Sequence, residues 1–318
     1  MASQPYVSII IPCKSIDEYA KDCINRCKHL DYEKYEIIVL PDETSEKIEG
    51  ARVILTGLVT PGAKRNIGIA NSVGEICAFL DSDAYPREDW LSNAVGYFED
   101  LEVVAVGGPG LTPDEDSLMQ KASGFVLSSF MVGNLSKRYK SKDVLESDDI
   151  HSCNFIARKS VLVEIGGWNE KYWPGEDTLI CGAIKRLGEK LVEAPNVIVY
   201  HHRRPLFRKH LKQVSSYGFH RGFFAKKFKE NSLRSLYFAP SFLVAFLLTG
   251  GVLSLFNHFT LTVFLLLAGG YLVLSLGASL ITVKALKLIP IVWLGTILTH
   301  LSYGVSFMIG FVKRDLQR

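Results

Sequence analysis

The sequence predicts an α/β protein with a mostly parallel sheet flanked by helices, followed by a transmembrane helical region at the C-terminal end. Short apolar runs alternate with amphipathic stretches over residues 1–202, which is typical of βαβ units. From about residue 236 the composition changes to long apolar runs. At 318 residues, the chain has room for one α/β domain and a further region.

Apolar runs predict strands at residues 7–12, 36–40, 53–55, 75–80, 103–107, 153–158 and 197–200. Amphipathic spacing predicts helices at residues 16–30, 62–70, 86–98 and 178–187, and polar residues 133–149 predict a loop. Polar residues follow several of these strands. Because the carboxyl ends of parallel strands share one edge, we expect these polar residues to converge on one cleft.

Asp81-Ser82-Asp83 directly follows a buried strand, and we predict that Pro86 begins the next helix. Carboxylates are costly to bury, so we expect the pair at the carboxyl edge of the sheet. Two hard carboxylate ligands there suit Mg²⁺ or Mn²⁺ shared with phosphate oxygens. The alternative is an ordinary turn or helix cap. His201, at the end of the last strand, is a candidate third ligand, with a structural histidine as the alternative.

Three further residues at this edge are candidates for binding a nucleotide. Asp42 follows the second strand and can accept hydrogen bonds from a base or ribose. Lys64 and Arg65 begin a helix and can contact phosphate, although a solvated helix start explains them equally well.

A second acidic pair, Glu176 and Asp177, begins a helix. Acids at a helix start often serve only as caps or dipole partners. The aromatic residues before this pair, including Trp173, are suited to the floor of a sugar pocket, and this favours a general base at the mouth of the cleft.

Charge is distributed unevenly along the chain. Residues 201–235 hold ten Lys or Arg and one acid, and residues 236–318 hold five and one, which leaves residues 1–200 with a net charge of −10. An acidic globular region repels nucleic acid, so we expect no nucleic-acid partner. The six cysteines have no zinc-site spacing, and we expect buried, reduced thiols. Residues 1–6 are polar, and we expect no signal peptide.

The basic segment of residues 203–235 is interleaved with aromatic and aliphatic residues, which indicates an amphipathic helix or helix pair on anionic headgroups. In this interpretation Arg203, Arg204, Gln213 and Arg221 contact a lipid phosphate. The alternative is a basic flank that only stops membrane insertion.

Three uncharged segments, residues 236–256, 259–283 and 288–312, are long enough to span a bilayer. With the globular region in the cytoplasm, three spans place Lys284 and Lys287 inside, as the positive-inside rule requires. They place Lys313, Arg314 and Arg318 outside, against that rule. We predict three spans, with a re-entrant or interfacial third segment as the alternative.

Several motifs, taken as an ordered series, carry a family resemblance. They are Val-Ser-Ile-Ile-Ile-Pro at 7–12, the acidic strand end at Asp42, Ala-Lys-Arg-Asn-Ile-Gly at 63–68, Gly-Glu followed by Phe-Leu-Asp-Ser-Asp-Ala within 74–84, Asn-Phe-Ile-Ala-Arg-Lys at 154–159, Gly-Gly-Trp at 166–168 and Gly-Glu-Asp at 175–177. Over about residues 5–205 the chain resembles glycosyltransferase family 2, with its Rossmann-like GT-A fold. The C-terminal layout resembles membrane-anchored bacterial members that build exopolysaccharide, including succinoglycan-type transferases, or lipid-linked glycans.

The resemblance implies inverting transfer from a nucleotide-diphospho-sugar, often UDP-linked, with a divalent cation, Mg²⁺ or Mn²⁺, as cofactor. It implies that Asp177 deprotonates the acceptor hydroxyl, with Glu176 nearby, and that Asp81 and Asp83 bind the metal–diphosphate. The donor site is expected to comprise Pro12, Asp42, Lys64, Arg65, Asn66, Asp81, Ser82, Asp83 and Asn154. The metal ligands are expected to be Asp81, Asp83 and His201. The acceptor side is expected to comprise Trp173, Arg203, Arg204, Gln213 and Arg221.

The family's usual Asp-Asp-Gly-Ser after the second strand is replaced by Asp42-Glu43-Thr44-Ser45, and the Gln-x-x-Arg-Trp motif of processive synthases is absent. Because the second motif is absent, we predict a single transfer to a lipid-linked or glycan acceptor. From the apolar segments and the basic segment before them, we predict a multi-pass protein of the plasma membrane with a cytoplasmic catalytic domain. The alternatives are a processive polysaccharide synthase and a catalytically inactive, membrane-anchored sugar-binding scaffold.

Overall fold

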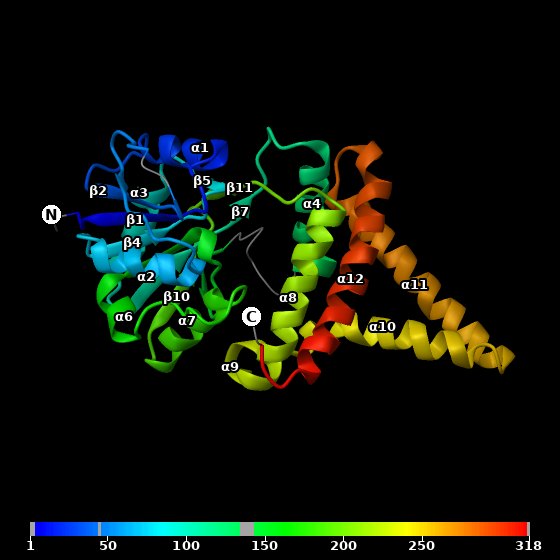
Figure 1. Cartoon of the computed structure of the whole chain (residues 1–318). Helices are drawn as coiled ribbons and strands as arrows, with labels where there is room; N and C mark the ends of the chain where they lie inside the picture. Colours follow the sequence, from blue (N-terminus) through cyan, green and yellow to red (C-terminus); the bar gives the residue numbers. More distant parts are fainter. Residues whose placement is uncertain (1–3, 44–45, 134–142, 317–318) are drawn as a thin grey trace. The chain divides into compact units, whose positions relative to one another are not determined.

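The computed structural model describes residues 4–43, 46–133 and 143–316 (Figure 1). The chain divides into two compact units. The α/β unit comprises Met1–Pro113 and Lys137–His202, and the helical unit comprises Asp114–Ser136 and Arg203–Arg318. Nothing in the sequence indicated that Asp114–Ser136 belongs to the helical unit.

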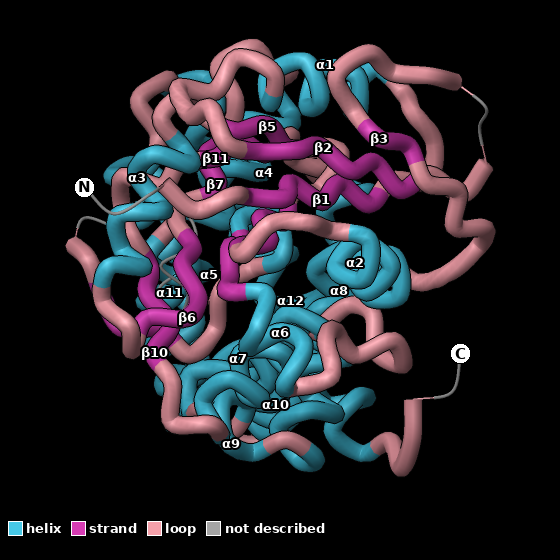
Figure 2. The backbone as a smooth tube through the Cα atoms, turned by 90° about the vertical axis from the view of Figure 1, so that its left-hand side faces the viewer, coloured by secondary structure: helices cyan, strands magenta, loops and turns pink. Residues whose placement is uncertain are grey.

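The α/β unit contains an eight-stranded mixed sheet in the order β3-β2-β1-β4-β9-β6-β10-β8. Its strands are β1 (Val7–Pro12), β2 (Tyr35–Leu40), β3 (Arg52–Val53), β4 (Ile76–Phe79), β6 (Val103–Gly107), β8 (Leu145–Ser147), β9 (Phe155–Arg158) and β10 (Lys190–Glu193). Figure 2 shows β1, β2 and β3 side by side, and these strands pair in parallel. The β1–β4 and β6–β10 pairs are also parallel.

The predicted α/β sheet is confirmed, but it is less parallel than expected. Strand β9 is antiparallel to both β4 and β6, and β8 is antiparallel to β10. The segment between β6 and β9 does not form a helical crossover on the sheet, because its helices belong to the helical unit. Strand β8 lies within the predicted loop of residues 133–149, of which residues 134–142 are outside the described residues.

Helices cover both faces of the sheet. They are α1 (Glu18–Cys27), α2 (Pro61–Asn71), α3 (Trp90–Gly96), α6 (Lys159–Glu164) and α7 (Glu176–Arg186), with single turns η1 (Tyr97–Glu99) and η3 (Ser152–Asn154). Successive strand residues face opposite sides. Ile9 therefore packs in one core with Ile24 of α1, whereas Ile10 packs in another with Ile180 of α7. All six cysteine thiols of the chain are buried, as expected.

A second, three-stranded sheet lies at the end of β4. It comprises β5 (Ala84–Pro86), β7 (Gly110–Leu111) and β11 (Val199–His201), with β11 in the middle. The prediction that Pro86 begins a helix is wrong, because Pro86 pairs with Val199 and α3 begins at Trp90. A proline is tolerated there because β5 is an edge strand.

The helical unit consists of α4 (Leu118–Ser128), α5 (Phe130–Gly133), α8 (Arg208–Lys227), α9 (Lys229–Ser232), α10 (Ser235–Leu253), α11 (His258–Thr282), the turn η4 (Leu286–Leu288) and α12 (Ile289–Val312). Helices α10, α11 and α12 are long and apolar enough to cross a membrane. His210 of α8 hydrogen-bonds both Ser123 (2.7 Å) and Thr299 (2.8 Å). These bonds link α4, α8 and α12.

Candidate active site

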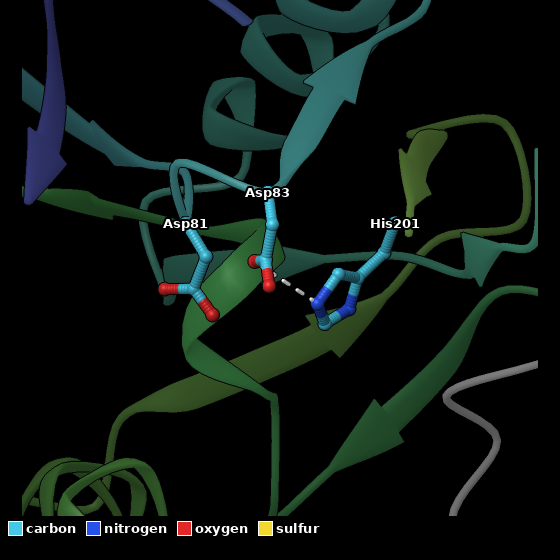
Figure 3. A group of neighbouring side chains, drawn as sticks. All are labelled: Asp81, Asp83 and His201. Atoms are coloured by element: carbon cyan, nitrogen blue, oxygen red, sulfur yellow. Dashed lines mark ion pairs between the residues drawn. The ribbon is translucent and has the colours of Figure 1, made fainter. Parts of the chain in front are cut away.

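The first acidic pair and His201 form one cluster (Figure 3). Asp81 and Asp83 lie on the turn between β4 and β5, and the antiparallel pairing of β5 with β11 places His201 opposite Ala84. Ligand atoms of the three residues lie within 4.8 Å of one another, and His201 Nε2 is 3.3 Å from Asp83 Oδ1. Two carboxylates and an imidazole form a donor set that fits Mn²⁺ or Mg²⁺.

The imidazole of His201 has a second neighbour, the buried thiol of Cys153. Burial lowers the pKa of His201, but Cys153 and Asp83 outweigh it and raise that pKa well above its ordinary value. Burial also opposes ionisation of Cys153, but His151 and His201 lower the pKa of the thiol to about 6. His151 Nδ1 lies 2.9 Å from the Cys153 sulfur. Sequence reasoning missed both residues, because the apolar run around Cys153 indicated only a packed thiol.

Arg65 connects the two acidic pairs. Its side chain is 2% exposed, and its two terminal nitrogens each donate a 2.8 Å hydrogen bond, one to Asp81 Oδ1 and the other to Glu176 Oε1. The guanidinium lies over the ring of Trp168, 4.7 Å from its centroid. The remaining nitrogen, Nε, has no hydrogen-bond partner among the described residues. Burial lowers the pKa of Arg65, but Asp81 and Glu176 outweigh it and raise the pKa, which keeps the group charged.

The second acidic pair lies at the first turn of α7. Gly175 precedes it with φ +114°, a backbone conformation that favours glycine. Glu176 is buried, and this burial raises the pKa of its carboxyl. Arg65 opposes this shift, and the neighbouring charge of Asp177 adds to it. Asp177 is half-buried and accepts a hydrogen bond from the backbone N–H of Thr178 (2.8 Å). Glu176 therefore holds Arg65, while Asp177 is the more accessible carboxylate.

Lys64 is buried among acceptors from its own unit. Its ammonium donates to the backbone oxygens of Cys13 (2.6 Å) and Leu40 (3.1 Å), and to the carboxylate of Asp42. Lys64 thus links the carboxyl ends of β1 and β2 and holds the carboxylate of Asp42 in place. The sequence indicated a phosphate contact for Lys64, whereas in the structure this side chain holds a neighbouring candidate residue.

Two other predicted donor-site residues have structural partners. Asn66 exchanges hydrogen bonds with the backbone of Trp168 and donates to Glu170, so it holds the Gly-Gly-Trp loop. Asn154 is fully buried, accepts from Trp90 Nε1 and donates to the oxygen of Val197. The structure therefore does not bring Asn154 to a surface that a donor can reach.

The remaining predicted residues lie in both units. Pro12 is buried at the end of β1, Ser82 is half-buried on the acidic turn, and Trp173 is 55% exposed. The predicted acceptor residues Arg203, Arg204, Gln213 and Arg221 belong to the helical unit. Their assignment to the acceptor side stays a prediction. Thr44 and Ser45, part of the variant motif after β2, are outside the described residues.

Comparison with known families gives a match over half of the chain. Residues 8–166, half of the chain, match the family described as Glycosyl transferase family 2. A pre-mycofactocin glycosyltransferase of Mycobacterium tuberculosis is 29% identical over 161 residues, which are 50% of this chain and 33% of that protein. The chain therefore matches only about a third of the length of this relative.

Two longer matches include the helical part of the chain. A dolichyl N-acetyl-alpha-D-glucosaminyl phosphate 3-beta-D-2,3-diacetamido-2,3-dideoxy-beta-D-glucuronosyltransferase of Methanococcus voltae is 21% identical over 78% of this chain and 83% of its own. A mannosyltransferase of Pyrobaculum calidifontis, solved in complex with GDP-Man and Mn²⁺, superposes with a TM-score of 0.59 and 19% identity. That match covers 96% of this chain and 88% of the other, and it shows a shared fold.

Proposed function

The chain belongs to glycosyl transferase family 2, and we propose that it transfers one sugar, with inversion, from a nucleotide-diphospho-sugar to a lipid-linked acceptor. One observation carries this proposal. Arg65 joins Asp81, in the candidate metal cluster, to Glu176, the neighbour of the candidate base Asp177. The residues for donor and acceptor chemistry are thus connected within one unit.

Each acidic group has a distinct role in the proposed reaction. Asp81, Asp83 and His201 would hold a divalent cation, which would neutralise charge on the leaving diphosphate. Asp177 accepts the proton of the acceptor hydroxyl as that oxygen attacks the anomeric carbon, and the bond from this carbon to the diphosphate breaks. Attack from the face opposite the leaving group inverts the anomeric configuration. Arg65 holds Glu176 beside Asp177 and orients Asp81.

The donor and acceptor classes are inferred from the resemblance in sequence and from two of the compared proteins. We propose a UDP-linked donor, from the resemblance in sequence, with GDP-mannose as the competing donor because the Pyrobaculum calidifontis mannosyltransferase was solved with it. A lipid-linked acceptor is supported by the dolichyl phosphate in the name of the Methanococcus voltae relative and by the apolar helices of this chain. We propose that these helices anchor the protein in the plasma membrane, with the catalytic unit in the cytoplasm.

The test is a transfer assay with the full chain in detergent, a panel of UDP-sugars and GDP-mannose, Mn²⁺ or Mg²⁺, and a polyprenyl-phosphate acceptor series. We expect Asp177→Asn to lower kcat by about 10²–10⁴-fold, the usual range for loss of a general base, while donor binding persists. We expect Asp83→Ala to abolish metal-dependent release of the nucleotide diphosphate.

Glu164→Gln, on the exposed side of α6, is the matched control and should transfer sugar normally. Full activity of Asp177→Asn would disprove the assigned base. A ladder of product lengths would identify a processive synthase instead. Donor binding by the unsubstituted chain without transfer or hydrolysis of any donor would identify a binding scaffold.

A further inference from the structure

The three long apolar helices differ in how much of them the protein itself covers. Over the most apolar part of each helix, 11% of residues are buried in α10 and 6% in α11, but 44% are buried in α12. Two of these helices therefore need an apolar surrounding along almost their whole surface. Helix α12 has a protein partner along one face.

That partner is α8, which runs beside α12 in the same direction. His210 bonds Thr299, and farther along both helices the Lys226 ammonium bonds the backbone oxygen of Lys313. Between these points the helices touch through glycines: a Cβ on Gly218 would lie 2.6 Å from the oxygen of Tyr303. Helix α8 thus follows α12 from its middle to its end, as Figure 1 also shows.

The beginning of α10 packs against the last turns of α12. The ring of Phe238 lies 4.7 Å from that of Phe307 and 5.7 Å from that of Phe311. Ser241 donates a 3.0 Å hydrogen bond to the backbone oxygen of Gly304. The start of α10 and the end of α12 must therefore lie at the same depth relative to any membrane.

The other end of α12 lies against the last part of α11. Trp293, in the second turn of α12, donates to Ser275 (2.9 Å), and His300 bonds the hydroxyl of Tyr271 (2.8 Å). Helices α10 and α11 meet each other near their connection, where Phe246 and Phe264 lie 5.4 Å apart. Helix α12 therefore runs from the end of α11 back to the beginning of α10.

These contacts are incompatible with three successive crossings. Three spans would put the beginning of α10 and the end of α12 on opposite faces of a hydrocarbon core about 30 Å thick. The contacts of Phe238 and Ser241 with α12 hold those two points together. A spanning α12 would also carry α8 into the bilayer, with the exposed Lys209 and Lys212 near the depth of Thr299. Cations at that depth are costly.

We propose that α10 and α11 cross the membrane as a hairpin, and that α12 lies with α8 along the membrane surface on the side where the hairpin begins and ends. The exposed face of α12 is apolar, with Leu294, Val305 and Ile309 all 42–48% exposed, and it enters the acyl boundary. The exposed lysines of α8 lie among the headgroups.

This arrangement also removes the conflict with the positive-inside rule that three spans create. The residues before α10, after α11 and after α12 include Arg234, Lys284, Lys287, Lys313 and Arg314. A single hairpin places all of these residues on one side, as the positive-inside rule requires of the cytoplasmic side. The connection at residues 254–257, which carries no Lys, Arg, Asp or Glu, is the part placed outside. This proposal is independent of the reaction proposed above.

The test uses the full chain in bacterial cells and a membrane-impermeant maleimide. One cysteine is added at a time, as Phe256→Cys in the connection, Lys287→Cys after α11 or Lys313→Cys after α12, all exposed positions. We expect Phe256→Cys to be labelled in intact cells, and the other two to be labelled only after permeabilisation. The unsubstituted chain, whose cysteines are buried, is the background control.

Three results would overturn the proposal. Labelling of Lys313→Cys in intact cells, with Lys287→Cys protected, would establish three spans. Protection of all three variants in intact cells would show that the hairpin does not cross. Labelling of Lys287→Cys and Lys313→Cys but not Phe256→Cys in intact cells would place the basic side outside. Equal labelling of all variants after permeabilisation, with retained stability, verifies that each variant is folded.

Discussion

At the scale of single residues, Arg65 shows how one buried cation can organise several acids. A buried guanidinium needs partners in most directions, and Arg65 has Asp81, Glu176 and the face of Trp168. Asp81 has two oxygens, so it can accept from Arg65 with one and coordinate a cation with the other. The position of the candidate metal cluster therefore depends on a residue that need not touch the metal or the donor.

We predict that Arg65→Lys lowers kcat by about 100-fold, an effect typical of small misplacements in active sites, with little change in KM for the donor. A lysine ammonium lacks the planar fork that reaches both carboxylates. Steady-state kinetics checks this, and Arg52→Lys, in a more exposed ion pair with Glu36, is the matched control. Added guanidinium should restore part of the activity of Arg65→Ala. If guanidinium restores nothing and only stability falls, the role of Arg65 is structural.

At this scale, the sequence predicts which residue types gather at the sheet edge, but it does not predict their hydrogen-bond partners. The end of a buried strand predicts the position of Asp81 and Asp83, because local burial cost decides it. The partners of Lys64 and Asn154 come from segments far away in the sequence, such as β2 and the residues before β11. No local pattern distinguishes a lysine that binds phosphate from one that hydrogen-bonds the ends of two strands.

At the scale of elements, the wrong predictions have the same cause: a local pattern does not show which distant segment a residue pairs with. Pro86 resembles a helix start, because proline is favoured at the first helical position, yet it ends an edge strand here. The continuous apolar runs at residues 7–12 and 75–80 were sufficient to predict β1 and β4, which are buried on both faces. Strands β5 and β7 have three and two residues, too few for any period to show.

Glycines determine how closely α8 and α12 approach. A Cβ on Gly222 would overlap the backbone oxygen of Phe307, and one on Gly310 would overlap that of Phe219. Backbone cannot yield as a flexible side chain does, so the helices would have to separate. By contrast, a Cβ on Gly269 of α11 meets no atom within 4 Å.

Overpacking costs about 1–3 kcal/mol, and replacing glycine by alanine in a helix regains about 1 kcal/mol. We therefore predict that Gly222→Ala destabilises the helical unit, by up to about 2 kcal/mol. Gly269→Ala is the matched control and should leave stability unchanged or slightly raised. The thermal unfolding midpoint of each variant in detergent decides between these outcomes. Equal midpoints for the two variants would show that α8 and α12 are not packed as closely as described.

At the scale of the whole molecule, charge is distributed unevenly along the chain. Residues 1–200 carry a net charge of −10, and in the proposed reaction most of the site residues that meet the diphosphate lie among them. Asp81 and Asp83 add to that charge, so an anionic donor is repelled unless a cation accompanies it. Donor binding and metal binding should therefore be strongly coupled in this chain.

We predict that neither UDP nor GDP alone stabilises the full chain appreciably, whereas Mn²⁺ with the correct nucleotide does. A ligand at 100 times its dissociation constant adds about 2.7 kcal/mol to the stability of the unit that binds it. Thermal unfolding in detergent measures this, with EDTA removing the shift. Asp83→Ala should lose the shift, while Asp89→Ala, whose carboxylate pairs with Arg87, should keep it. An equal shift in EDTA would show that the acidic cluster does not bind the donor through a metal. Since only the α/β unit contains that cluster, an unfolding step of the helical unit should keep its midpoint throughout.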